Sequence, residues 1–511
     1  MGKLRPMRMI CAVLAGSALA LTACGGASDG GGDGATTEGG KGQQLTIALA
    51  ADPASLDPQL ADDGSERAVN DNIYETLLTR DIDGTLEPLL AEELPEQIKP
   101  TVWRFKLRSD VKFSNGEPFG ADDVVASVTR VLDPDYASGQ LGFLTGIESA
   151  SAVDDQTVDI ITKEQDPLLQ ARMAFLKIIP AEYSKDPKFA TDPIGTGPYL
   201  FDERIPGERI TLKINPEYWG DAPPIKDVVI RIISDESARL AALKAGEVDL
   251  VTNLSPDYAK QVPNFLNAPG AENTNLRLNN QDAGALTADV RVRQALNYAV
   301  DRQAIADKIY SGYARPLKCS TIPEQAFGHN PDLQPYPYDP DKARQLLTEA
   351  GAVGKTIQFV SNPDRWLKAR EVSQAIASYW EAAGLKVKLE FQEWNDYLET
   401  LVAKRNKPEA LYHSSTNDLL DADRQVSSYY ISSSGTSAFK DDEIDRLADE
   451  ARSEGDPDAR LDLYKQLTQR ACDQAAFVFI VNVDDMYGAS KRLQFEPRAD
   501  QRLLVSEMRV G

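Results

Sequence analysis

The stretch Trp103-Arg104-Phe105-Lys106-Leu107-Arg108 opens the part of the sequence that decides the fold. Its apolar residues alternate with basic ones, which predicts a β-strand with one buried face. Val111 and Phe113 continue the apolar side, and Asn115-Gly116 is a turn signal. Ala121–Leu132 then has the apolar spacing of an amphipathic helix whose first turn carries acids, where the helix dipole favours them. Strand, turn and helix in close succession predict a mixed α/β fold.

The rest of the chain alternates between strand and helix patterns in the same way. Strands are predicted at 44–50, 228–233, 248–251, 356–360, 385–391, 410–413 and Phe477–Val483. Helices are predicted at 70–79, 237–245, 290–305, 367–383, 394–404 and 441–452, and from Pro457 to about residue 474. The strand–helix–strand pattern between 356 and 391 predicts two parallel strands joined by a right-handed crossover.

These elements predict two α/β bodies that divide near residue 278, with a C-terminal tail that returns to the first body. Gly195-Thr196-Gly197-Pro198-Tyr199 is predicted to be a tight connection, in which two glycines allow unusual backbone angles and Pro198 fixes one. In open α/β sheets ligands bind beyond the carboxyl ends of strands, so we expect the ligand in a cleft between the two bodies.

The N-terminus has the pattern of a secretory signal. Lys3, Arg5 and Arg8 precede an apolar run of about 13 residues, which is too short to span a bilayer. Leu21-Thr22-Ala23-Cys24 resembles the bacterial lipobox, whose cysteine becomes the acylated first residue of the mature protein. We therefore expect a signal peptide at 1–23, lipidation of Cys24 and a flexible Gly-rich linker at 24–43. An ordinary signal peptide with a chance cysteine is the alternative.

The composition limits the partners. The 511-residue chain has 42% hydrophobic residues and a net charge of −24, and removal of Lys3, Arg5 and Arg8 with the signal gives −27. Such acidity argues against binding to nucleic acid and against broad adhesion to anionic lipid, so the membrane is expected to be contacted only through the anchor. Cys319 and Cys472 remain in an exported chain, where they form either a disulfide or two separately buried thiols.

Catalytic motifs are missing from the sequence. His329 and His413 are the two histidines, and they lie too far apart to form a local motif. The chain has no His-Glu-x-x-His, Gly-x-Ser-x-Gly or Cys-x-x-Cys pattern. Paired carboxylates remain open, because spacing alone excludes no pair among 79 acids. We expect a binding protein rather than an enzyme, with no cofactor and no metal site.

Several further blocks give the chain a family resemblance. Together with the stretch 103–124, they are Ala51-Asp52-Pro53-Ala54-Ser55-Leu56-Asp57-Pro58, Ile73-Tyr74-Glu75-Thr76-Leu77, Gly195-Thr196-Gly197-Pro198-Tyr199, Asn215-Pro216-Glu217-Tyr218-Trp219 and Val292-Arg293-Gln294-Ala295-Leu296. In this order they resemble the extracytoplasmic solute-binding proteins of ABC importers, in the peptide- and nickel-binding cluster called family 5. The resemblance covers nearly all of the mature chain. Most of the blocks are expected to pack in the core rather than to touch ligand.

The resemblance implies a fold and a division into domains. The fold is a two-lobed α/β periplasmic-binding-protein-like fold of type II, with an extra domain in the first lobe. The first lobe is expected at 44–278, with the extra subdomain at about 80–188, and the second lobe at 279–483. The tail at 484–511 is expected to return to the first lobe. Two strand-like crossings would form the hinge, and ligand would favour the closed arrangement of the lobes.

The resemblance also implies a site. In peptide-binding relatives an Asp in a segment like Trp-x-x-Asp-Tyr-x-Asp-Pro pairs with the amino group of the peptide, and Asp418 falls on this position. A loop acid or helix cap is the alternative role. Ser415 stands where the aromatic residue would be, and Ala422 replaces the proline, so Tyr412 or His413 is the candidate aromatic platform.

Other candidate ligand-binding residues come from this segment, from the first lobe and from a loop of the second lobe. They are Asn417 beside Asp418, Asp52 and Pro53 after the first strand, and Arg365, which either receives a carboxylate or forms a surface salt bridge.

The predicted function is that of a monomeric, lipid-anchored receptor on the extracytoplasmic face of the cell membrane. It would deliver a peptide to the permease subunits of an ABC transporter. A non-peptide solute such as an opine, a sugar or a chelated metal, a sensory lipoprotein and a lipoprotein hydrolase are the alternatives.

Overall fold

The computed structural model describes residues 43–144, 146–403 and 407–511. The predicted signal peptide, Cys24 and all of the predicted linker except Gln43 lie outside the described residues. No helix in the described ranges combines the length and the hydrophobicity that a membrane crossing requires.

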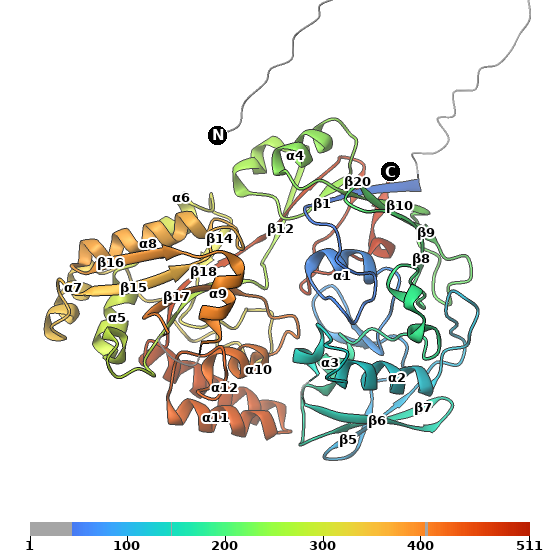
Figure 1. The fold of residues 1–511 in the computed structure, drawn as a ribbon, viewed down its shortest axis with the longest axis horizontal. Coiled ribbons are helices and arrows are strands. Elements are labelled where there is room, and N and C mark those ends of the chain that lie inside the picture. Colours follow the sequence, from blue (N-terminus) through green and yellow to red (C-terminus); the bar gives the residue numbers. More distant parts are fainter. Residues whose placement is uncertain (1–42, 145, 404–406) are drawn as a thin grey trace, which may run out of the picture. The chain divides into compact units, whose positions relative to one another are not determined.

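The first lobe is built on a seven-stranded mixed sheet (Figure 1). Its order is β12-β19-β11-β1-β10-β9-β8, and β1 runs parallel to both β10 and β11. The strands are β1 (Gln44–Leu49), β8 (Tyr199–Ile205), β9 (Arg209–Ile214), β10 (Asp227–Ile232), β11 (Leu250–Val251), β12 (Asn264–Ala268) and β19 (Asp485–Ala489). Helices α1 (Gly64–Asn70) and α4 (Glu236–Lys244) belong to this lobe, and β20 (Leu493–Gln494) pairs with β21 (Arg509–Val510) at the C-terminus.

A four-stranded antiparallel sheet forms the extra part of the first lobe. Its order is β4 (Glu96–Lys99), β5 (Val102–Lys106), β7 (Thr157–Thr162) and β6 (Ile147–Asp154). Residues 103–106 of the alternating stretch 103–108 lie in β5, an inner strand of this sheet, and Phe105 and Leu107 are buried with residues of α2 (Ala121–Leu132) in one apolar cluster. The short α3 (Leu169–Met173), β2 (Leu78–Arg80) and β3 (Leu86–Pro88) complete this part.

The second lobe is built on a six-stranded sheet flanked by helices (Figure 1). Its order is β14 (Ala314–Pro316), β18 (Phe477–Val483), β13 (Asn273–Leu278), β17 (Ala410–Ser415), β15 (Thr356–Ser361) and β16 (Lys386–Phe391). The predicted strand–helix–strand unit is present, with β15 and β16 parallel around α8 (Ala369–Ala383). The other helices are α5 (Val290–Tyr298), α6 (Arg302–Lys308), α7 (Pro340–Glu349), α9 (Trp394–Leu401), α10 (Ala422–Gln425), α11 (Asp442–Ser453) and α12 (Pro457–Asp473).

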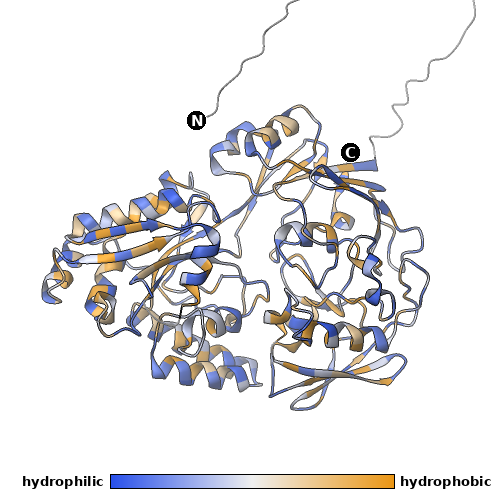
Figure 2. Cartoon of the chain, in the orientation of Figure 1, coloured by the Kyte–Doolittle hydropathy of each residue, from blue (hydrophilic) through white to orange (hydrophobic). Residues whose placement is uncertain are grey.

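Apolar strands and amphipathic helices make the cores of both lobes. Figure 2 shows strands with much hydrophobic colour, whereas the helices alternate between hydrophilic and hydrophobic colours along their length. In the second lobe, for example, Trp380 of α8 packs on Phe359 of β15, and both are fully buried. The helices thus cover sheet surface with the apolar stripe that their sequences predict.

Two crossings connect the sheets. The chain changes sheet between Ala268 and Asn273, and it changes back at Asp484, between β18 and β19. The chain thus passes from the first sheet to the second before the predicted lobe boundary at 278, because β13 belongs to the second sheet. The crossings lie side by side: Asn482 donates from Nδ2 to the carbonyl of Gly270 at 2.7 Å. A Cβ on Gly270 would come within 2.2 Å of the Val483 carbonyl, so this close approach requires glycine.

Several blocks of the family resemblance meet at one buried point. The buried Glu75 carboxyl accepts hydrogen bonds from Tyr218 Oη at 2.8 Å and Trp219 Nε1 at 2.9 Å. Burial raises the pKa of Glu75 to about 7, against the effect of these hydrogen bonds. A Cβ at Gly195 would lie 2.1 Å from the Ile73 carbonyl, so this glycine is required by close approach rather than by the unusual angle predicted for it.

Some elements differ from the prediction. The helix predicted at 70–79 is absent: α1 ends at Asn70, and tertiary contacts use the groups that a longer helix would need. The Asn72 carbonyl accepts from the Tyr199 amide at 3.1 Å, and the Ile73 carbonyl accepts from the Gly197 amide at 2.9 Å. The helix predicted at 290–305 is divided into α5 and α6.

The C-terminal segment contacts the first lobe. Beyond β19 in the first sheet, the Val505 amide donates to Asn72 Oδ1 at 2.8 Å. In the second lobe, Cys319 and Cys472 form a disulfide, which decides between the two alternatives left open by the sequence.

Candidate functional site

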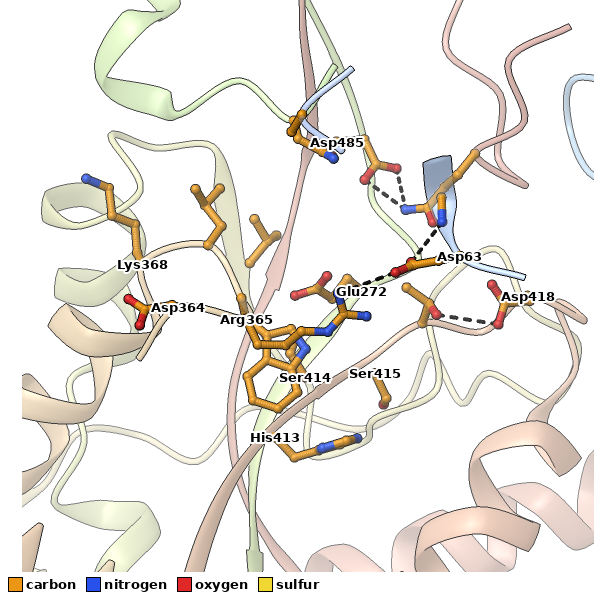
Figure 3. Close-up of a pocket in the computed structure, with 18 of the residues that line it drawn as sticks. Asp63, Glu272, Asp364, Arg365, Lys368, His413, Ser414, Ser415, Asp418 and Asp485 are labelled. Atoms are coloured by element: carbon orange, nitrogen blue, oxygen red, sulfur yellow. Dashed lines mark hydrogen bonds and ion pairs between the residues drawn. The ribbon is translucent and has the colours of Figure 1, made fainter. Parts of the chain in front are cut away.

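A cavity of about 980 Å³ lies between the two lobes, beside the crossings. Arg67 of α1 and Phe143 line it from the first lobe, and the segments 363–368 and 413–416 line it from the second. Glu272 and Asp485, one from each crossing segment, complete the lining. Figure 3 shows how their carboxyl groups and the second-lobe residues face a common space. A site that takes residues from both lobes can respond to lobe closure.

Asp418 lies in this lining and already has a partner in the first lobe. Arg67 Nη1 donates to Asp418 Oδ1 at 2.7 Å, while the other side of the same guanidinium binds Asp62. Burial acts to raise the pKa of Asp418, but Arg67 and Arg424 outweigh it, so the pKa of Asp418 is lowered. The carboxylate is therefore ionised, and a ligand ammonium would have to share it with Arg67 or displace Arg67.

The loop that carries Asp418 makes further contacts with the first lobe. Leu419 is buried in an apolar cluster with Phe143, Leu168 and Ala171. Arg80 Nη2 donates to the Leu419 carbonyl at 2.6 Å. Because these partners all belong to the first lobe, the loop closes one side of the cavity.

Aromatic side chains form one wall of the cavity. Trp366, Trp394, His413 and Tyr429 all line it. Trp366 lies edge-on to Trp394 at 5.9 Å and to His413 at 5.4 Å, and the rings of His413 and Tyr429 are 5.0 Å apart. This wall offers flat apolar surface for a ligand side chain or ring.

His413 presents an unused acceptor in that wall. Its side chain is only 7% exposed, and its Nε2 has no hydrogen-bond partner among the described residues. Tyr397 Oη donates to the Tyr412 carbonyl at 2.7 Å, so its 3.2 Å contact with His413 Nδ1 requires the proton on Nδ1. Burial, with Arg277 and Arg424, lowers the pKa of His413 well below its usual value. The imidazole is neutral, and Nε2 is a bare acceptor.

Glu272 and Asp485 differ from the other carboxylates of the lining. Within the described residues these two have no ion-pair partner, whereas the others each pair with an arginine or lysine: Asp62, Asp63, Asp364, Glu371, Asp418 and Asp484. Gln501 Nε2 contacts both oxygens of Asp485 at 2.8 Å. Burial raises the pKa of Asp485 to about 7, and the charges of Glu272 and Asp484 add to this effect. Burial also raises the pKa of Glu272, against a hydrogen bond from Ser414 and the charge of Arg365.

The predicted site residues divide into those that line the cavity and those that do not. Asp418, Ser415 and Arg365 line it, and Arg365 Nη1 lies 3.8 Å from Asp63 Oδ2. Asn417 and Tyr412 are buried outside the lining, where the Asn417 side chain binds the backbone of Asp421 on both sides.

Asp52 and Pro53 are also absent from the lining. Arg204 binds both of them, and the Gly207 amide donates to Asp52 Oδ2 at 2.8 Å. Of the two candidate platforms, His413 lines the cavity and Tyr412 lies behind it.

Sequence reasoning missed Trp366, Trp394, Glu272 and Asp485. Asp485 is the second residue after the predicted strand Phe477–Val483, next to Asp484, so polar residues at the carboxyl end of a strand were an available signal. Glu272 precedes β13 and gave no comparable signal. Searched over the described ranges, the chain has no cluster of three or more histidine, cysteine or carboxylate side chains arranged to hold a metal ion.

Comparison with known proteins agrees with this architecture. Residues 85–437 match the bacterial extracellular solute-binding proteins, family 5 Middle. Heme-binding protein A of Haemophilus influenzae is 30% identical over 91% of this chain and 92% of its own length. The dipeptide-binding protein of Escherichia coli is 30% identical over 84% of this chain and 87% of its own length.

Solved structures are similar over nearly the whole described chain. The periplasmic binding protein DppA of Helicobacter pylori, in complex with the peptide STSA, has a TM-score of 0.76 at 25% identity, covering 91% of this chain and 98% of its own. HbpA2 of Haemophilus parasuis has a TM-score of 0.81 at 25% identity, covering 92% and 100%. The predicted type II periplasmic-binding-protein-like fold is thus confirmed. The chain belongs to family 5 of the bacterial extracellular solute-binding proteins, the solute receptors of ABC importers.

Proposed function

We propose that this protein binds a short peptide in the cavity between its lobes and delivers it to the permease of an ABC importer. The observation that carries the proposal is the cavity itself, whose volume of about 980 Å³ is at the upper end for ligand pockets. Such a volume leaves room for a ligand of several residues.

The distribution of charge supports a zwitterionic ligand such as a peptide. Asp418, Glu272 and Asp485 supply acceptors, and Arg365 and Arg424 supply donors in the same lining. The backbone and both ends of a peptide need donors and acceptors of this kind. Asp418, as the expected anchor of the peptide amino group, and Arg365, as a partner for a carboxylate, remain part of the proposal.

The proposal includes the membrane anchor. Cys24 would carry acyl chains and tether the receptor to the extracytoplasmic face of the membrane as a monomer, with the Gly-rich linker between. The mass of the protein purified from its own membrane fraction checks this part. It should exceed the mass of the polypeptide from Cys24 onward by the mass of acyl chains.

Native mass spectrometry of the chain expressed without residues 1–24 tests the ligand. We expect a series of bound masses that denaturation releases as a mixture of short peptides. A single mass that matches heme, an opine or a metal chelate would replace the peptide by that solute. Turnover of the released ligand would contradict a binding function.

A further inference from the structure

The carboxyl groups of Glu272 and Asp485 are placed differently from the other acids of the cavity. Glu272 ends the first crossing, directly before β13, and Asp485 follows the second crossing at the start of β19. The crossings are hydrogen-bonded to each other, and the Val483 amide donates to the Glu272 carbonyl at 3.3 Å. The two side chains therefore line the cavity from the two segments that connect the lobes (Figure 3).

The protein itself does not neutralise this pair. The nearest guanidinium to affect Glu272 is that of Arg365, and Arg365 is in ion-pair range of Asp63 instead. Asp484, the other acid beside Asp485, is bound by Arg315 at 2.7 Å. Gln501 contributes an uncharged donor to Asp485. Two carboxyl groups without a countercharge in a half-buried position keep their protons unless a cation stabilises the ionised form.

His413 adds an independent observation. It is a nearly fully buried side chain that lines the same cavity, its Nε2 has no partner among the described residues, and the hydrogen bond from Nδ1 leaves Nε2 as an acceptor only. A buried acceptor without a partner is costly, so a donor from the ligand is expected there. The crossing segments and the adjoining wall thus present acceptors to whatever fills the cavity.

We propose that Glu272 and Asp485 form a cation subsite at the hinge, which binds a nitrogen cation of the ligand, an ammonium or a guanidinium, while His413 accepts a hydrogen bond from the same ligand. The subsite is additional to Asp418. It rests on one part of the proposed function, namely that a solute binds in the cavity. In a peptide the cation is either the amino terminus or a lysine or arginine side chain.

The experiment measures binding of matched probes by isothermal titration calorimetry. The probes are trialanine, N-acetyl-trialanine, Ala-Arg-Ala and N-acetyl-Ala-Arg-Ala amide, with arginine and agmatine as small cations. We expect the double variant Glu272→Gln/Asp485→Asn to lose about tenfold or more in affinity for the cationic probe that binds best, because charge-assisted hydrogen bonds are lost. The acetylated probes identify which cation is bound. If the double variant also loses affinity for N-acetyl-Ala-Arg-Ala amide, whose amino terminus is blocked, the bound cation is the arginine side chain.

Controls separate this effect from a general loss of negative charge. Glu247→Gln and Asp202→Asn remove the same charges from exposed pairs with Arg231 and Lys213, outside the cavity, and should leave the affinity unchanged. Equal affinity of wild type and double variant for every cationic probe would overturn the subsite. Binding of N-acetyl-trialanine, which carries no cationic nitrogen, as tightly as trialanine and Ala-Arg-Ala would do the same.

A second measurement on the wild-type protein does not depend on the variants folding. Asp485 retains a proton near neutral pH, and Glu272, Asp484 and Gln501 are the groups around it. A bound cation favours the ionised carboxylates, so binding at pH 6.5 should release protons, and affinity should rise as the pH rises toward 8. Titrations in two buffers of different ionisation enthalpy detect this release, and its absence would contradict the subsite.

The outcomes also separate this inference from the proposed function. If no peptide binds but a cationic non-peptide solute does, the peptide proposal fails and the subsite stands. If the protein releases a solute that carries no cationic nitrogen, or binds none of the cationic probes at millimolar concentration, the subsite is overturned whatever the function is.

Discussion

Asp485 connects the chemistry of the cavity with the stability of the empty protein. In the folded state its carboxyl keeps its proton to about pH 7, whereas in the unfolded chain it ionises near its ordinary value. Between these two values the unfolded state has released a proton that the folded state retains, so the stability of the folded state falls as the pH rises. A residue placed for binding a cation thus costs stability when no cation is bound.

Asp485→Asn should remove the fall in stability with rising pH that the Asp485 carboxyl causes. We expect the free energy of unfolding of the ligand-free variant to exceed that of wild type increasingly from pH 4 to pH 8, by on the order of 1–3 kcal/mol, because one pKa unit corresponds to about 1.4 kcal/mol. Glu75, with its pKa raised in the same range, is common to both proteins and cancels in the difference. Urea unfolding across the pH series measures the difference in free energy of unfolding between variant and wild type. A difference that stays constant with pH would contradict the raised pKa of Asp485.

Asp418 gives a second prediction for a single residue. If its carboxylate anchors a peptide amino group, Asp418→Asn should weaken binding of free-amine peptides by about tenfold or more and leave N-acetylated peptides unaffected. The alternative, that Asp418 serves only as the partner of Arg67, predicts the same small change for both peptides. Calorimetry with the matched pair distinguishes these roles, with Asp202→Asn as the charge-matched control.

At the scale of elements, the sequence predicted the helices and strands whose formation depends on their own apolar periodicity. The unit β15-α8-β16 was predictable from the spacing of its apolar residues. They recur with the period of two residues typical of a strand in β15 and β16, and with the period of a helix in α8. The capping box of Asp63 and Glu66 marks the start of α1 in the sequence, but the prediction placed a helix after its end. That error has a tertiary cause, since contacts of Asn72 and Ile73 with distant segments replace helical hydrogen bonds.

The site was less predictable than the fold for the same reason. Asp418 and Arg365 lie near the ends of predicted strands, and both line the cavity. Asp52 also follows a strand, yet Arg204 from β8, far along the chain, binds it outside the cavity. Glu272 and Asp485 come together only because two crossings, about two hundred residues apart in the chain, run side by side. Such a juxtaposition depends on topology rather than on any local pattern.

The disulfide is the covalent link between elements of the second lobe. It joins Cys319 to Cys472 of α12 over a sequence separation of 153. Closing so long a loop restricts the unfolded chain, and removal of such a link typically costs about 2–5 kcal/mol. We expect Cys319→Ser/Cys472→Ser to lower the free energy of unfolding by this amount in urea. Ligand affinity should stay unchanged, because neither cysteine lines the cavity; a loss of affinity would show that the link also shapes the site.

At the scale of the whole molecule, the contacts across the cavity set the balance between open and closed lobes. Arg67 of the first lobe pairs with Asp418 of the second and lies 4.8 Å from the ring centroid of Phe175. Lys368 reaches back from the second lobe to Asp257 of the first. These contacts favour closure even without ligand. A ligand amine at Asp418 would take over a bond that Arg67 now makes, so ligand replaces one inter-lobe contact by others.

Arg67→Ala should therefore open the empty protein without preventing ligand-driven closure. We expect the ratio of open to closed molecules to rise by up to about tenfold, since the partly buried ion pair between Arg67 and Asp418 joins the two lobes and is lost. Single-molecule energy transfer between dyes at residues 202 and 349 of the two lobes measures this ratio. Arg204→Ala, which removes an arginine whose contacts with Asp52 and Pro53 stay within the first lobe, is the matched control. Indistinguishable distance distributions for Arg67→Ala and wild type would show that the remaining contacts between the lobes, which include Lys368 with Asp257 and the packing of Leu419, hold the lobes together without Arg67.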